Sequence, residues 1–348
     1  MVMEEKYKGV KPLVFLEEQL VCYSKGFLCV CENGKFHSLN KLQETSWLER
    51  IRLLRRLFRR EPKHAKAISK DQIIVAMNKH LFIVNTVDGL MNKVFTAREG
   101  FSDPLNICTE CKPWIALWGD YGSNPDKTEV NIYGLTENLK TEILYTFPPN
   151  RIRHIHNIIP RLRGGFYILT GDTEATAGIY MAESDFKCVK EVKLGSQQFR
   201  AVVAFDTENG LLYATDSVNE PNHIYLLKEN GEITRICSLK GSCIYGTSCD
   251  NDYYFSTTVE PDESKKGILS WFTYKRGKGI LSNHVTLVRV DAYYNSEEVL
   301  DLDKDIFPMK LFQYGSIQFP SGCTNDLWIY PTAVKKFDGF AIRMENHC

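Results

Sequence analysis

The stretch Arg153-His154-Ile155-His156-Asn157 is followed, after a short turn of arginine and glycine residues, by Gly165-Phe166-Tyr167-Ile168-Leu169-Thr170-Gly171-Asp172. The apolar residues of both segments and the glycines between them predict two strands joined by a turn. Because side chains alternate faces along an extended backbone, His154 and His156 fall on the same side of the first strand. The start of one strand and the end of the next lie at the same end of a hairpin, so both imidazoles are predicted to lie near Asp172.

This arrangement repeats along the chain. A strand-like run over 199–203 precedes a run that ends in Asp216, a later run ends in Glu260, and Asp172, Asp216 and Glu260 follow one another at intervals of 44 residues. Groups of strand-like runs begin near 12, 65, 102, 152, 198 and 243, and a seventh group fills the C-terminus. Seven units, each with about four strands, predict an all-β fold, a seven-bladed β-propeller of four-stranded antiparallel blades. We expect residues 1–348 to form a single propeller domain.

The composition narrows the classes of function. The 43 basic and 43 acidic residues cancel, so no overall field attracts nucleic acid, and no strand interleaves basic with aromatic residues as nucleic-acid readers do. The sequence also lacks a glycine-rich phosphate loop, a Gly-x-Ser-x-Gly elbow and a His-Glu-x-x-His motif. Nucleotide hydrolases, serine esterases and zincins are therefore disfavoured.

The termini and cysteines indicate a compartment. Four of the first eight residues are charged, and no apolar run approaches the roughly 18 residues that span a bilayer, so we expect a cytoplasmic protein without a transmembrane segment. Many of the eleven cysteines lie in apolar strand-like runs, which predicts free thiols. The lone Cys108-Thr109-Glu110-Cys111 motif has no second pair or flanking histidine, and a structural role is favoured over zinc or redox chemistry.

One segment breaks the β pattern. Ser46-Trp47-Leu48-Glu49 matches a capping box, and apolar residues recur at helical spacing until Pro62, which predicts a short basic amphipathic helix near residues 46–60. The arginines of Arg50–Arg60 occupy much of the remaining surface of this helix. The helix either packs its apolar stripe on the propeller with solvated arginines, or makes a peripheral contact with an anionic membrane or an acidic protein.

The polar residues of the repeat predict a site. The ends of second strands supply Asp120, Asp172, Asp216 and Glu260, and the starts of first strands supply His154, His156 and Arg200. Trp118 and Tyr121 flank Asp120 and could stack on a ligand. Acids at equivalent turns of a repeat also cap loops, and this structural role remains open for each of them. Two adjacent imidazoles are poor core fillers, which favours His154 and His156 as metal ligands or as general acid and base.

Several of these segments carry a family resemblance. Trp118-Gly119-Asp120-Tyr121, Ile152-Arg153-His154-Ile155-His156, Thr170-Gly171-Asp172, Thr215-Asp216 and Thr257-x-Val259-Glu260 resemble the sialidase-like (BNR, or Asp-box) propellers of bacteria and archaea. The resemblance covers about 100–265. It implies a carbohydrate-associated propeller and brings no established catalytic mechanism.

Two functions from different classes fit these residues. The first is a carbohydrate-active enzyme that acts on or binds an acidic glycan at a central pocket, as a glycoside hydrolase or a lyase. A hydrolase would use Asp172 and Asp216 as acid and base, with Glu260 as a further carboxylate, whereas a lyase would use His154 or His156 as base or metal ligand and Arg200 to hold the carboxylate. Trp118, Asp120 and Tyr121 would then bind the substrate. The second is a non-catalytic propeller that binds a glycan or a protein. No cofactor is certain, and a divalent metal at the histidines is the expected candidate.

Overall fold

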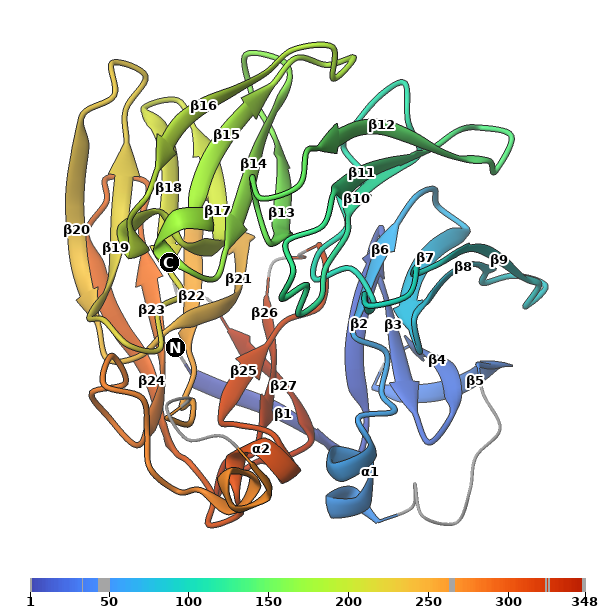
Figure 1. The fold of residues 1–348 in the computed structure, drawn as a ribbon. Helices are drawn as coiled ribbons and strands as arrows, with labels where there is room; N and C mark the ends of the chain where they lie inside the picture. The colour runs from blue at the N-terminus through green and yellow to red at the C-terminus, as the bar shows by residue number, and fades with distance from the viewer. Residues whose placement is uncertain are drawn as a thin grey trace. The chain divides into compact units, whose positions relative to one another are not determined.

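The computed structural model describes residues 2–32, 34–42, 51–262, 267–322, 324 and 326–345. Their strands form seven antiparallel sheets, which are the blades of a seven-bladed β-propeller (Figure 1). Six sheets have four strands. In the remaining sheet a single bridge between Cys108 and Leu117 stands beside three strands. The sequence prediction of seven antiparallel blades is confirmed.

The chain divides into two compact units. The first comprises Met1–Glu61, Asp216–Ile224 and Ile236–Cys348, and the second comprises Pro62–Thr215 and Tyr225–Arg235. Whether residues 1–348 behave as one domain stays a prediction. No helix among the described residues is long and apolar enough to cross a membrane, and a cytoplasmic location also stays a prediction.

Three sheets lie within the first unit. Their strands are β2 (Lys11–Leu16), β3 (Gln19–Ser24), β4 (Phe27–Glu32) and β5 (Lys35–Lys41); β21 (Cys243–Cys249), β22 (Asp252–Thr257), β23 (His284–Val290) and β24 (Ser296–Asp303); and β25 (Ser316–Gln318), β26 (Leu327–Thr332), β27 (Phe340–Glu345) and β1 (Val2–Lys8). The N-terminal strand β1 pairs with β27, with Tyr7 opposite Ala341. This pairing of the two chain ends was not predicted.

Three sheets lie within the second unit. Their strands are β6 (His64–Ala67), β7 (Gln72–Met77), β8 (His80–Asn85) and β9 (Met91–Thr96); β10 (Ala116–Gly119), β11 (Val130–Leu135) and β12 (Thr141–Phe147); and β13 (His154–Pro160), β14 (Phe166–Gly171), β15 (Gly178–Ala182) and β16 (Val189–Leu194). The seventh sheet contains β17 (Ala201–Thr207), β18 (Gly210–Thr215), β19 (Asn222–Leu227) and β20 (Ile233–Leu239).

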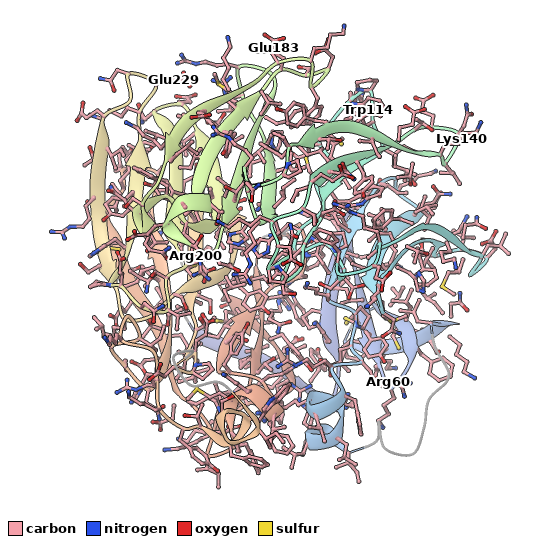
Figure 2. The ribbon with its side chains drawn as sticks, viewed as in Figure 1. Arg60, Trp114, Lys140, Glu183, Arg200 and Glu229 are labelled. Carbon is pink, nitrogen blue, oxygen red and sulfur yellow. The ribbon has the colours of Figure 1, made fainter. Side chains whose placement is uncertain are left out.

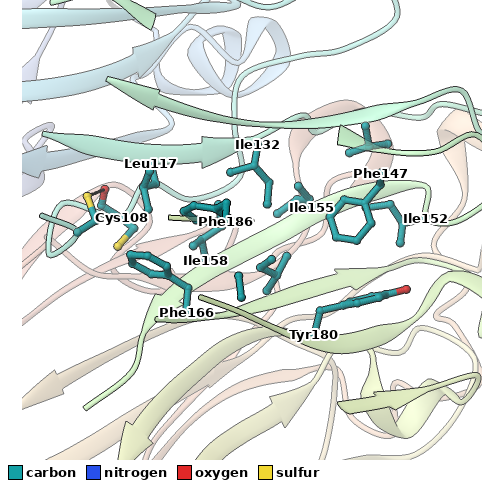
Figure 3. Packing of buried hydrophobic residues seen from close by; sticks show 14 residues of the cluster. Cys108, Leu117, Ile132, Phe147, Ile152, Ile155, Ile158, Phe166, Tyr180 and Phe186 are labelled. Atoms are coloured by element: carbon teal, nitrogen blue, oxygen red, sulfur yellow. Dashed lines mark hydrogen bonds between the residues drawn. The ribbon is translucent and has the colours of Figure 1, made fainter. Parts of the chain in front are cut away.

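An apolar layer in the second unit fixes which side of β13 is buried. Ile155 packs in a cluster with Leu117 and Ile132 from the preceding sheet and Phe166 from β14 (Figure 3). Burial of such a side chain contributes about 1.5–3 kcal/mol. Because neighbouring side chains alternate along a strand, this packing turns His154 away from the apolar layer.

The helix prediction is correct in place and wrong in orientation. Helix α1 spans Arg52–Phe58, while 43–50, including the predicted capping box and Arg50, lie outside the described residues. Arg55 and Arg56 are buried, whereas Ile51 and Phe58 of the predicted apolar stripe are about half exposed. The other helical segments are α2 (Met309–Phe312), η2 (Glu174–Thr176), η3 (Gln197–Phe199) and η4 (Ile268–Phe272).

The arginines of α1 bind carboxylates of their own chain, in what we call the arginine–carboxylate cluster: Arg52, Arg55, Arg56, Glu61, Asp305 and Asp338. Arg52 pairs with Glu61 at 2.7 Å and with Asp338 at 3.2 Å, and Arg56 pairs with Asp305 at 2.6 Å. The predicted solvated face is therefore wrong for Arg52, Arg55 and Arg56, and a membrane or protein contact through the Arg50–Arg60 helix stays a prediction. Their guanidinium groups already have anionic partners within the chain.

The cysteines follow the prediction with one correction. Eight described cysteines are free, and in the Cys108-x-x-Cys111 motif the Cys111 thiol donates to the Cys108 carbonyl at 3.4 Å. Cys249 is disulfide-bonded, so the prediction that all eleven cysteines are free thiols is wrong there.

Candidate functional site

Two strands of one sheet bring His154, His156 and Asp172 together, and we call these three side chains the histidine–aspartate cluster. The Nε2 atoms of the two histidines are 3.0 Å apart. Asp172 Oδ1 lies 3.3 Å from His154 Nε2 and 3.5 Å from His156 Nε2. Both histidines are buried, and the Asp172 side chain is 28% exposed. The cluster thus opens to solvent on the side of its carboxylate.

A β-bulge places His156. His154 pairs with Gly171 and Ile155 with Thr170, but the next pair in register is Asn157 with Leu169, so His156 is the extra residue. Such a bulge redirects a side chain. Gly171 makes room for the redirected ring, because a Cβ built at this position would lie 2.3 Å from His156 Cε1. First strands β2, β17 and β21 have register shifts at equivalent positions.

Backbone carbonyl groups determine the tautomers of the two imidazoles. His154 Nδ1 contacts the Gly122 carbonyl oxygen, and His156 Nδ1 contacts the Ala201 carbonyl oxygen at 2.8 Å. A carbonyl oxygen can only accept, so each Nδ1 carries the hydrogen and donates it. In the neutral imidazoles both Nε2 atoms therefore present lone pairs, and they present them to each other and to Asp172.

This geometry fits a metal ion. Three electron-pair donors that face one another repel unless a cation lies between them, and the three ligand atoms lie within 4.8 Å of one another. Ligands about 2.0–2.2 Å from a tetrahedral ion are themselves roughly 3.3–3.5 Å apart, close to the separations in the cluster. A proton can bridge two of the three atoms, whereas a metal ion can bind all three. Carbonyl groups that hold the opposite nitrogen are also the usual outer partners of metal-binding histidines.

The pKa shifts keep the ligands in the form that binds metal. Burial lowers the pKa of His156, which favours the neutral imidazole. Burial alone would raise the pKa of Asp172, but hydrogen bonds and charge from His154 and His156, which act when these imidazoles are protonated, bring it well below its usual range. When the imidazoles are neutral, the contacts with Arg153 and Arg200 favour the ionised carboxylate.

Two arginines surround the carboxylate. Arg200, at the start of β17 (Figure 2), places its guanidinium 3.3 Å from Asp172 Oδ1 and also donates to the Asp172 carbonyl oxygen at 3.1 Å. Arg153 lies 3.5 Å from Asp172 Oδ2. With neutral imidazoles, one carboxylate faces two guanidinium groups, so the site carries excess positive charge.

An aromatic residue and a lysine lie beside the cluster. The Tyr121 ring is 4.8 Å from the His154 ring, centroid to centroid. On Tyr121 lies Lys63, whose Nζ is 4.3 Å from the ring centroid and donates to the Asp103 carbonyl oxygen at 3.1 Å. Tyr121, predicted as a substrate-binding residue, is thus placed at the cluster.

The other two residues of the Trp118-Gly119-Asp120 segment are placed elsewhere. Trp118 is 1% exposed and packs against Phe95 and Tyr133. It offers no face to a sugar, so its predicted stacking role is wrong. Asp120 is also buried, and it accepts hydrogen bonds from the Arg98 guanidinium at 2.8 Å and from the backbone N–H of Asn131 at 2.8 Å. These contacts match the loop-capping role left open above, and a substrate-binding role for Asp120 is disfavoured.

Asp216 and Glu260 belong to the first compact unit, so their predicted convergence with His154 stays a prediction. Both are buried. Glu260 accepts hydrogen bonds from the hydroxyls of Ser242 and Thr258. Burial, helped by Glu260, raises the pKa of Tyr245 to about 12. Asp216 adds to the effect of burial in raising the pKa of the Cys243 thiol.

Sequence reasoning missed three parts of the site. Arg153 adjoins His154 and could have been included from its position alone. The bulge at His156 and the two carbonyl acceptors leave no signal in residue types, because any residue supplies a carbonyl oxygen. Lys63 lies 58 positions before Tyr121, and no spacing rule connects them.

Comparison with known proteins supports the fold. No protein-family model and no curated protein sequence matches the chain. Among solved structures, the WD40 β-propeller domain of Doa1 is similar with a TM-score of 0.57 and 8% identity, covering 100% of this chain and 96% of that one. An oligogalacturonate lyase from Vibrio parahaemolyticus is similar with a TM-score of 0.55 and 8% identity, covering 98% and 90%. An oligogalacturonate lyase in complex with manganese has a TM-score of 0.53 and 9% identity, covering 98% and 90%. Identities this low show a shared propeller fold alone.

Proposed function

We propose that the protein is a carbohydrate-active β-propeller that binds a divalent metal ion at the histidine–aspartate cluster and acts on an acidic glycan there. The observation that carries the proposal is the convergence of two Nε2 lone pairs and one carboxylate oxygen within 4.8 Å. Imidazole and carboxylate ligands suit zinc, manganese and related divalent ions. His154, His156 and Asp172 would hold the ion.

The excess positive charge supports an acidic ligand. A divalent ion added beside Arg153 and Arg200 leaves positive charge that a single aspartate does not offset, and the carboxylate of a uronic acid would offset it. The neighbour described as an oligogalacturonate lyase with manganese, and the sialidase-like resemblance, agree with this class of ligand. Both the resemblance and the glycan remain proposals.

A lyase fits the site better than a hydrolase. A hydrolase that uses Asp172 as general acid needs a protonated carboxyl group, whereas the contacts of Asp172 with Arg153 and Arg200 favour the ionised form. In an elimination from a uronic acid, the proton next to the carboxylate would pass to a base from solvent, because the three cluster side chains would hold the metal. The electron pair of the broken C–H bond forms a double bond, the bond to the leaving oxygen breaks, and that oxygen takes up a proton from solvent. A bound metal would withdraw charge from the substrate carboxylate. Arg200 and Arg153 would hold that carboxylate, and Tyr121 would cover the adjacent ring face.

The metal proposal can be tested directly. The purified protein, stripped with chelator, is titrated with Mn²⁺ and Zn²⁺ by calorimetry. We expect binding that falls at least about 100-fold in His156→Ala and Asp172→Asn, since outer-sphere changes alone typically cost 10–100-fold. His80→Ala is the control, because His80 also begins a strand and contacts Thr96. Unchanged binding in His156→Ala would overturn the proposal.

The glycan proposal needs a separate measurement. Uronic acid oligosaccharides are added to the metal-loaded protein, and ultraviolet absorbance reports the unsaturated product of an elimination. Arg200→Gln is expected to weaken oligosaccharide binding while metal binding persists. Binding without product would favour the alternative, a non-catalytic glycan-binding propeller. Metal binding with no affinity for any acidic oligosaccharide would contradict the glycan proposal and leave the metal site standing.

A further inference from the structure

Large apolar side chains are exposed close together in the first compact unit. In η4, Ile268 is 80% exposed and Trp271 and Phe272 are half exposed or more. Residues three apart eclipse in a 3₁₀ turn, so Ile268 and Trp271 share one face. Tyr274, just after η4, and Ile306, just before α2, are also largely exposed.

The elements that carry these side chains lie against one another. Helix α2 contacts both η4 and α1, and α1 and α2 are seen side by side in Figure 1. Phe58, at the end of α1, adds a further exposed ring. We name the set the apolar–basic surface: Phe58, Ile268, Trp271, Phe272, Tyr274 and Ile306, with the exposed Arg59 and Arg60.

Buried cations of the arginine–carboxylate cluster and Lys304 fix the backbone that carries part of this surface. Arg56 donates to the Phe312 carbonyl oxygen at 2.7 Å and binds Asp305, which precedes Ile306. Lys304 Nζ donates to the Phe307 carbonyl oxygen at 3.1 Å. The segment that presents Ile306 is therefore fixed by buried cations and does not depend on its exposed side chain.

Among the described residues of this surface, the exposed charged side chains are basic. Glu61, Asp305 and Asp338 are turned inward to Arg52, Arg55 and Arg56, and Asp262 pairs with Lys275 at 2.8 Å. Arg59 and Arg60 remain exposed at the end of α1, and Arg60 is labelled in Figure 2. Positive charge beside exposed tryptophan, tyrosine, phenylalanine and isoleucine is the pattern of proteins that lie on an anionic membrane.

We infer that the apolar–basic surface docks on anionic lipid bilayers. Trp271 and Phe272 enter the boundary between headgroups and acyl chains, and Arg59 and Arg60 face the lipid phosphates and carboxylates. The alternative occupant, an apolar groove of a protein partner, fits less well, because these side chains project from short elements and the flanking cations match a charged plane.

The test measures co-sedimentation of the 348-residue chain with phosphatidylcholine vesicles that contain or lack phosphatidylserine. We expect binding to the anionic vesicles that weakens with added salt. Trp271→Ser with Phe272→Ser should lower this binding roughly tenfold or more. Arg59→Gln and Arg60→Gln should lower it by roughly fivefold each, and only for the anionic vesicles.

Tyr293→Ser is the matched control. Tyr293 is 86% exposed in the turn between β23 and β24, outside the apolar–basic surface, and its loss should leave binding unchanged. A blue shift of tryptophan fluorescence on anionic vesicles, lost in Trp271→Phe, would place that ring in the bilayer boundary. Absence of vesicle binding, or binding that survives the double serine variant, overturns the inference. A dimer that the double serine variant dissolves, without vesicle binding, would assign the surface to a second copy of the chain.

Discussion

Two buried polar clusters, one in each compact unit, differ in how their charges match. In the arginine–carboxylate cluster every cation faces a carboxylate: Arg52 has Glu61 and Asp338, and Arg56 has Asp305 and Asp338. In the histidine–aspartate cluster, lone pairs face lone pairs. The first arrangement is complete within the chain, whereas the second would be completed by the cation of the proposed function.

Because of this difference, we expect the arginine–carboxylate cluster to contribute to stability and the histidine–aspartate cluster to contribute to binding. A charge buried with its partner destabilises the fold strongly when that partner is removed, because the remaining charge stays buried. A group held in an unfavourable arrangement for binding can be removed at little cost, or with a gain in stability. The two clusters should therefore respond to substitution in opposite ways.

The largest expected effect is in the arginine–carboxylate cluster. Arg56 is 3% exposed, and Arg56→Gln leaves Asp305 and Asp338 with less positive charge. We expect the free energy of unfolding to fall by about 3–5 kcal/mol, measured by urea denaturation. Arg60→Gln, on the exposed end of the same segment, should change it by less than about 1 kcal/mol. If Arg56→Gln and Arg60→Gln both change the free energy of unfolding by less than about 1 kcal/mol, the charges of the arginine–carboxylate cluster are not matched within the chain.

A smaller effect depends on pH. Lys11 is buried with its Nζ 5.8 Å from the Tyr330 ring centroid, and burial lowers its pKa to about 8, partly offset by Glu61. An unfolded lysine keeps its proton to about pH 10.4, so above about pH 8 the unfolded state binds more protons and stability rises with pH. Between about pH 8 and about pH 9.5 the rise from this group is on the order of 2 kcal/mol.

Lys11→Met isolates this contribution. The variant should be more stable than the natural protein at neutral pH, and the difference should shrink as the pH rises through this window. Tyrosines with raised pKa values, such as Tyr213, act in the opposite direction only above their unfolded pKa near 10. Denaturant unfolding at several pH values gives the difference. A difference that does not change with pH would contradict the burial of a charged Lys11.

The sequence predicts the blades well because their signal is local. Alternating strands and glycine turns repeat in each blade, and the seven groups correspond to seven sheets. The pairing of β1 with β27 joins residues at opposite ends of the chain, and no local pattern reports it. Helical periodicity in α1 was detected, but periodicity alone does not say which face is inside. The carboxylates of Glu61, Asp305 and Asp338 decide that question, and Asp305 and Asp338 come from distant segments.

The site was predicted only in part. Strand alternation predicts the place of His154 beside Asp172 and the repeat spacing that of Arg200, whereas the position of His156 depends on a bulge that residue types do not report. Trp118 and Asp120 were predicted to bind substrate because they adjoin one another in the sequence, yet Trp118 packs against Phe95 and Asp120 accepts hydrogen bonds from Arg98 and Tyr133. Which side of a strand meets a neighbouring blade depends on packing between sheets, and a sequence pattern does not contain that information.

The smallest expected effect concerns the space beside His156. Gly171→Ala adds a Cβ that would lie 2.3 Å from His156 Cε1, so the ring must move. We expect a loss of about 1–2 kcal/mol in the free energy of unfolding, as for other overpacked sites, and a roughly tenfold loss of metal affinity if the cluster binds metal. In a His156→Ala background the ring is absent, and Gly171→Ala should then cost little. Urea unfolding of the four proteins in this cycle gives the coupling energy between the two positions. If Gly171→Ala lowers the free energy of unfolding equally in both backgrounds, Gly171 is needed for a reason other than the ring of His156. The idea that the fold makes room for His156 in order to bind a ligand would then lose its main support.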